Sequence, residues 1–93
     1  MAQNIVLLDN AAATGSAKTW SGGRGQFKAL GSFGGATVTL QILGPDGATW
    51  LSLGSDAALT AAGVANFDAP SGQLRAAVNG GSPSGLYASV ASL

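Results

Sequence analysis

The residues of this chain that could carry out chemistry are its four aspartates, because the sequence contains neither histidine nor cysteine. Asp9, Asp46, Asp56 and Asp68 each lie in a stretch that predicts a turn, where an aspartate side chain bonds to the local backbone. A catalytic carboxylate pair would need two of them within about 5 to 10 Å, and nothing in their spacing suggests such a pair. We therefore expect no catalytic residue and no enzyme activity.

The same residues predict no metal or cofactor site. Thiolate and imidazole ligands for zinc are missing, and no calcium-loop pattern of closely spaced aspartates occurs. Residues 15–19 (GSAKT) lack the Gly-Lys-Ser/Thr sequence of a phosphate loop. Arg24 is a single basic residue in a chain whose four basic and four acidic residues cancel, so we expect no nucleic-acid partner.

Aromatic side chains are the next candidates for recognition, because exposed rings stack on sugars or anchor protein contacts. In so small a domain, two of Trp20, Trp50 and Tyr87 are expected to belong to a core or an interface. Arg75 is expected to face outward and to pair with Asp68 across a turn. With an apolar run near the N-terminus, the predicted interface residues are Ile5, Val6, Leu7, Leu8, Trp20, Arg24, Trp50, Arg75 and Tyr87.

Residues 36–53 (ATVTLQILGPDGATWLSL) predict the hairpin around which the other elements are arranged. Val38, Leu40 and Ile42 alternate with polar residues, as in a strand with one face in a core. Residues 44–47 (GPDG) then predict a type I turn followed by a left-handed glycine, because proline presets φ and glycine accepts positive φ.

A second run, 26–33, shows the same alternation. It places Phe27 and Phe33 on one face and Lys28 and Leu30 on the other, so the two phenylalanines are expected to anchor the core.

Gly34 and Gly35 predict a two-residue hairpin connection, which would make three consecutive antiparallel strands. Turn signals recur about every 8 to 12 residues, and no helix is predicted. The fold class is therefore all-β: a small antiparallel β-sandwich or jelly-roll-like barrel of about seven or eight short strands. The other predicted strand segments are 5–8, 19–20, 48–53, 58–60, 64–68, 73–78 and 86–90.

The composition indicates one domain, much of whose surface is covered by other protein. Residues 26–93 are expected to form a single β-sandwich, preceded by an N-terminal arm and flexible loop over residues 1–25. Only 9% of the 93 residues are charged and the net charge is zero, which favours association. We expect a homo-oligomer, a trimer or alternatively a dimer. No signal peptide or apolar span is evident, so synthesis in the cytoplasm and no membrane partner are expected.

From residue 36 onward the chain resembles a group of small bacteriophage virion proteins with head-decoration or fibre-like structural roles. The resemblance covers about two-thirds of the chain and implies a β-sandwich or jelly-roll-like subunit that oligomerises on a capsid or tail. It carries no catalytic residue. The matching positions are 44–47 (GPDG), Trp50, 59–63 (LTAAG), Phe67, 70–75 (PSGQLR) and 85–89 (GLYAS).

The resemblance and the composition together predict a virion protein. It would be a capsid decoration or cement subunit that stabilises or ornaments the particle through β-mediated contacts with the major capsid protein or another virion protein. The N-terminal arm would add a strand to a neighbour. The alternative is a carbohydrate-binding or receptor-binding tip module of a tail or head fibre.

Overall fold

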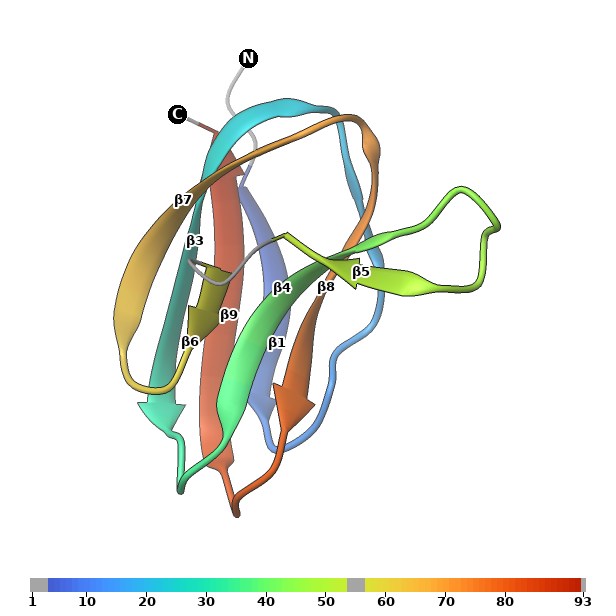
Figure 1. Cartoon of the computed structure of the whole chain (residues 1–93). Coiled ribbons are helices and arrows are strands. Elements are labelled where there is room, and N and C mark those ends of the chain that lie inside the picture. Colours follow the sequence, from blue (N-terminus) through green and yellow to red (C-terminus); the bar gives the residue numbers. More distant parts are fainter. Residues whose placement is uncertain (1–3, 54–56, 93) are drawn as a thin grey trace.

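Nine β-strands build the protein, in a computed structural model that describes residues 4–53 and 57–92 (Figure 1). The expected count was about seven or eight, and two of the nine strands are very short: β2 has three residues and β6 has two. No helix in these ranges has the length and apolar character to span a bilayer. The strands are β1 (Asn4–Ala11), β2 (Lys18–Trp20), β3 (Gly23–Ser32), β4 (Thr37–Leu43), β5 (Trp50–Ser52), β6 (Ala58–Leu59), β7 (Gly63–Ala69), β8 (Gly72–Asn79) and β9 (Ser84–Ser92).

The strands form two antiparallel sheets, which confirms the all-β sandwich. Sheet A has the order β1-β9-β3-β7; sheet B has the order β2-β8-β4-β5, with β6 also paired to β4. In β3, Phe27 is buried while Lys28 and Leu30 are exposed, as the alternation predicts. Phe33 is also buried. The core between the sheets includes Leu7, Leu8, Trp20, Phe27, Val38, Leu40, Phe67, Leu74, Leu86 and Val90.

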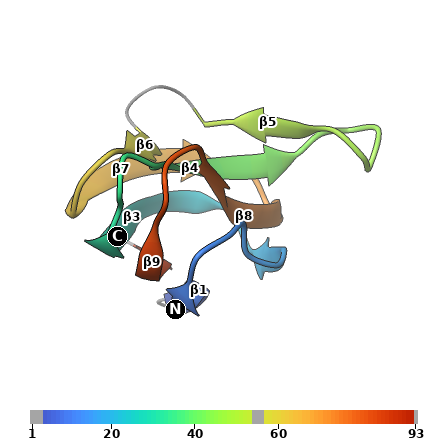
Figure 2. The ribbon, with the colours of Figure 1, turned by 90° about the horizontal axis from the view of Figure 1, so that it is seen from below.

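The predicted β4–β5 hairpin is present. Gly47 N donates to Gly44 O over 3.0 Å, and Gly47 has φ +73°, as a type I turn with a following left-handed glycine requires. Gly44 N donates to Thr49 O over 2.6 Å and closes the loop. Figures 1 and 2 both show this hairpin reaching beyond the other strands, so its tip lies away from the core.

Asp46 organises the hairpin tip through its carboxylate. Thr49 Oγ1 donates to Asp46 Oδ2 over 2.6 Å, and the backbone N–H groups of Thr49 and Ala48 donate to Oδ1 over 2.9 and 3.0 Å. These bonds, that from the Thr49 hydroxyl foremost, lower the pKa of Asp46 from its ordinary value of 3.8 to about 2.

A first prediction concerns the acid sensitivity of this tip. A carboxylate whose pKa is lowered on folding stabilises the fold above its ordinary pKa, and that contribution is lost as pH falls from about 4 to 2. Asp46→Ala lacks this contribution already at neutral pH, so the difference in free energy of unfolding between wild type and variant should shrink as pH falls from about 4 to 2. NMR titration of the Asp46 carboxyl checks the pKa; a midpoint near 4 in the wild-type protein contradicts the prediction.

The hairpin predicted at Gly34 and Gly35 is wrong. Both glycines have positive φ, +57° and +87°, but the connection carries the chain from β3 in sheet A to β4 in sheet B. β3 lies between β9 and β7, so both its edges are already paired. The turn packs against the β8–β9 connection at the bottom of Figure 1, where Ser82 N donates to Gly34 O over 3.0 Å.

The backbones of these two connections pack closely, which explains why position 81 is a glycine. A Cβ on Gly81 would collide with Ala36 N and, at 2.6 Å, with Gly34 O. Gly81 also has φ +61°, where side chains are strained.

The prediction of an N-terminal arm and flexible loop over residues 1–25 is also wrong for the residues of this range that the structure describes. β1 pairs with β9, β2 pairs with β8, and β3 begins at Gly23, so the sandwich starts well before residue 26. Leu7 and Leu8 are consecutive yet both buried, because the β1–β9 register shifts between Val6 and Leu8. The apolar run 5–8 belongs to an edge strand of sheet A rather than to a free arm.

Candidate interaction surface

Exposed apolar side chains gather on the outer face of sheet A. Among the described residues, five large apolar side chains are exposed. Four of them project from this face because their strands alternate with buried neighbours, and we call these four the apolar face: Val6 (55% exposed), Leu30 (54%), Val64 (58%) and Tyr87 (43%). The fifth, Leu51, lies on β5 of sheet B. Val6, Leu30 and Tyr87 lie around one hollow of the surface, and exposed apolar groups gathered in this way mark contact sites.

Strand register brings residues that are distant in sequence together on this face. Val6 of β1 lies opposite Ser89 of β9, and Ser89 lies opposite Lys28 of β3. Lys28 in turn lies opposite Val64 of β7. The four strands thus place one row of side chains across the whole sheet, with a single positive charge in the row.

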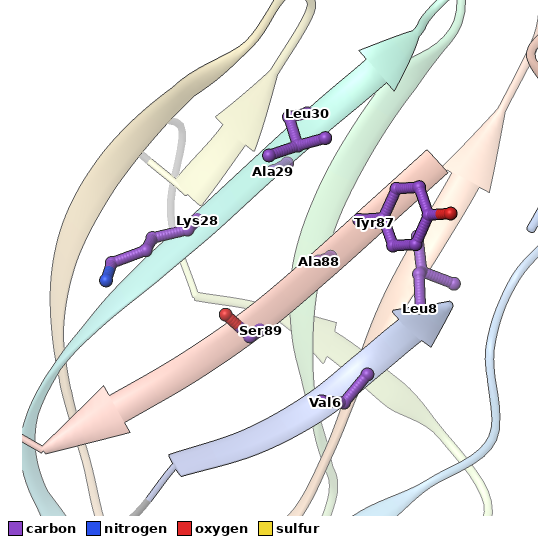
Figure 3. Close-up of a pocket in the computed structure, with 8 residues that line it drawn as sticks. All are labelled: Val6, Leu8, Lys28, Ala29, Leu30, Tyr87, Ala88 and Ser89. Atoms are coloured by element: carbon purple, nitrogen blue, oxygen red, sulfur yellow. The ribbon is translucent and has the colours of Figure 1, made fainter. Parts of the chain in front are cut away.

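A hollow of about 220 Å³ lies beside that row (Figure 3). Leu30 and Tyr87 are cross-strand partners at its wall. In Figure 3 the Lys28 side chain extends away from both, so its ammonium group does not fill the hollow. The site holds no acid–base pair; it can receive an apolar side chain. Its lining comprises Val6, Leu8, Lys28, Ala29, Leu30, Tyr87, Ala88 and Ser89.

The outer face of sheet B is different, because it combines an aromatic ring with polar groups. Arg75 Cζ lies 4.4 Å from the ring centroid of Trp50, a cation–π contact, and Arg75 Nε donates to Gln41 Oε1 over 2.8 Å. Arg75 and Gln41 are cross-strand partners on β8 and β4. The expected Arg75–Asp68 pair is therefore wrong: Asp68 lies in sheet A, opposite Arg24.

Trp20 is a core residue and not a surface residue. It is 0% exposed, and its ring lies 5.1 Å from that of Phe67, centroid to centroid. Its Nε1 has no hydrogen-bond partner among the residues that the structure describes. The expectation that Trp20 contacts a partner or a sugar is therefore wrong. Sequence alternation assigns the ring to one side of its strand but does not show that the other sheet covers that side.

The other predicted interface residues are divided between surface and interior. Val6, Arg24 and Tyr87 are exposed; Ile5, Trp50 and Arg75 are half-buried; Leu7 and Leu8 are core residues. Sequence reasoning missed Leu30 and Val64. The alternation of residues 26–33 did assign Leu30 to the outer face, which was the available signal.

Metal-ligating side chains are dispersed in the described part of the chain, which brings no three of His, Cys, Asp or Glu together. Asp56, one of the aspartates considered above, lies outside the described residues.

Comparison with known proteins shows similarity in fold. No protein-family model and no curated protein sequence matches the chain. Among solved structures, the SPBc2 prophage-derived protein YomS superposes with a TM-score of 0.71 at 14% identity, covering 98% of this chain and 90% of YomS. IMPa from Pseudomonas aeruginosa, solved with an O-glycopeptide, gives 0.53 at 13% identity over 99% of this chain but only 12% of IMPa. At these identities the matches establish the sandwich fold alone.

Proposed function

We propose that this chain is a structural protein of a bacteriophage virion, a decoration or cement subunit that binds the major capsid protein or another virion protein and acts without turnover. The observation that carries the proposal is the apolar face, which gathers four of the five exposed large apolar side chains of the described residues on one sheet. The fold shared with a prophage-derived protein supports a phage origin.

The binding energy would come from covering the apolar face. Burying a Val or Leu side chain completely is worth about 1.5–3 kcal/mol, and these side chains are already half covered, so each contributes roughly 1 kcal/mol. The loss of translational and rotational freedom on association offsets part of this free energy, so several such contacts must be made in one binding surface. Lys28, in the middle of the row, can cover apolar surface with its stem while its ammonium group pairs with a carboxylate of the shell protein.

The second prediction tests this footprint. Leu30→Asp places a charge beside the hollow and should weaken binding to particles at least tenfold, because the carboxylate would be desolvated without a partner. The measurement is co-sedimentation of purified protein with particles of the encoding phage that lack it. Leu51→Asp is the matched control, since Leu51 is similarly exposed (48%) but lies on β5. Equal binding by both variants would remove the apolar face from consideration.

A glycan-binding tip module is the second candidate, favoured by the Trp50, Arg75 and Gln41 group on sheet B. Arg75 occupies one face of the Trp50 ring, so a sugar would stack on the other face, with Gln41 able to donate or accept hydrogen bonds. Because Trp20 is buried, a change in tryptophan emission on adding glycans would report on Trp50. A saturable shift that Trp50→Phe abolishes supports this candidate, and no shift across a broad glycan panel counts against it.

A further inference from the structure

Sheet A ends at an edge strand that lacks the usual protection. β7 pairs with β3 residue for residue, from Gly23 opposite Ala69 to Ala29 opposite Gly63, without a register shift. The opposite edge, β1, is interrupted by two register shifts, and its Asn10 has φ +52°. The edges of sheet B are short, because β2 and β5 have three residues each and β6 has two. β7 is thus the long, regular edge of the described structure.

The composition of β7 also leaves it open to pairing. Natural proteins block sheet edges with charged side chains, lysine above all, and with proline; the β7 sequence GVANFDA contains no lysine and no proline. Val64 is 58% exposed on its outer face, and its one charged residue is Asp68. Among described strands, β3 alone pairs with β7, so no described strand occupies the other edge of its backbone.

We propose that β7 pairs antiparallel with β7 of a second copy of this chain. An antiparallel pair of identical strands is self-complementary, so a two-fold axis relates the copies and the contact closes as a dimer. One register overlaps all seven residues, and it places Asn66 opposite Asn66 of the second copy. Val64 then lies opposite Asp68 of the second copy. The two sheets A become one continuous sheet of eight strands.

Side chains on the outer face suit this register. The side chains next to the two-fold axis are all amides. Gln26 Nε2 donates to Asn66 Oδ1 over 3.4 Å, and the second copy repeats this pair across the axis. In the next row Asp68 lies between Arg24 of its own chain and Val64 of the second copy, with Lys28 of that copy one strand further. No like charges are adjacent in this row, and Arg24 lies directly opposite Asp68.

The contact selects a dimer over the trimer expected from composition, because a trimer would need two different surfaces to meet. It concerns copies of this chain alone. It can therefore be tested on purified protein, independently of any binding to a phage particle.

Cross-linking tests the register directly, because the chain has no native cysteine. In the proposed pair, the two Cα atoms of residue 66 lie within the range that a disulfide bridges, whereas the two copies of residue 64 are about 14 Å apart. Asn66→Cys should form a covalent dimer under mild oxidation at least ten times faster than Val64→Cys does. An equimolar mixture of Val64→Cys and Asp68→Cys should regain fast cross-linking. Equal rates for Asn66→Cys and Val64→Cys would overturn the register.

Charge substitution tests whether the same contact holds the native dimer. Asn66→Lys and Asn66→Asp each bring like charges together at the axis and should each raise the dissociation constant at least tenfold, measured by sedimentation equilibrium. Mixing the two variants should restore the dimer. Asn79→Lys, a change of the same exposed residue type at the end of β8, should leave it unaffected. A wild-type monomer up to about 1 mM, or Asn66→Lys dimerising as wild type does, would overturn the proposal.

Discussion

Removing residues 1–11 is expected to unfold the domain, not to release an intact sandwich without its arm. The truncation deletes β1 and with it Leu7 and Leu8, both of which are buried in the core. Each buried leucine lost costs about 2–5 kcal/mol, so the pair costs about 4–10 kcal/mol. A domain of this length has a total free energy of unfolding of only about 5–14 kcal/mol. Circular dichroism with thermal unfolding measures the outcome.

Single substitutions separate the stability that the buried leucines of β1 contribute from the effect of shortening the chain. Leu7→Ala should lower the free energy of unfolding by about 2–5 kcal/mol. Val6→Ala, at the neighbouring exposed position of the same strand, should lower it by less than about 1 kcal/mol. A truncated protein that keeps the thermal midpoint of the full chain would show that β1 is dispensable and would restore the interpretation of this segment as an arm.

The other large effect is expected at Trp20. Trp20→Ala should lower the free energy of unfolding by about 3–5 kcal/mol, because the indole is fully buried and its removal leaves a cavity. Trp20 comes from β2 of sheet B and contacts Phe67 of β7 in sheet A, with the rings inclined at 52°. The substitution therefore removes a contact that joins the two sheets. Chemical denaturation followed by circular dichroism gives the value.

Trp50 provides the matched control for Trp20. Trp50→Ala removes a half-buried ring and its contact with Arg75, for which a loss of about 1 kcal/mol is expected. Trp20→Phe should lose less than Trp20→Ala, because phenylalanine keeps an aromatic ring in the core and removes the unpaired Nε1 donor. Equal losses for the alanine variants at positions 20 and 50 would contradict the assignment of Trp20 to the core.

The two proposed contacts are compatible in one assembly. Pairing through β7 uses the strand edge, whereas binding to a shell protein uses the outer face of sheet A. A dimer would present two copies of the apolar face on the same side of one extended sheet. Two footprints on one rigid unit raise the effective affinity for a repeating surface such as a capsid.

Local sequence was sufficient for the strands and for the clearest turn. The alternation in residues 26–33 separated buried Phe27 from exposed Lys28, and the GPDG segment predicted the left-handed glycine at position 47. Both outcomes depend on interactions between residues close in the chain, namely the two-residue period of a strand and the φ preferences of proline and glycine. The all-β class follows from the same local signals repeated along the chain.

Apart from the β4–β5 hairpin, tertiary structure decided which strands pair, because the other pairings join strands that are distant in sequence. Gly34 and Gly35 have the positive φ values of a hairpin turn, yet the same turn serves a crossing between sheets once β7 and β9 occupy both edges of β3. Alternation likewise assigns a side of a strand but not what covers it. The sequence therefore did not show that Trp20 lies in the core. Nor did it show that Leu30 and Val64, thirty-four residues apart, lie on the same outer face, because that depends on the pairing of β3 with β7.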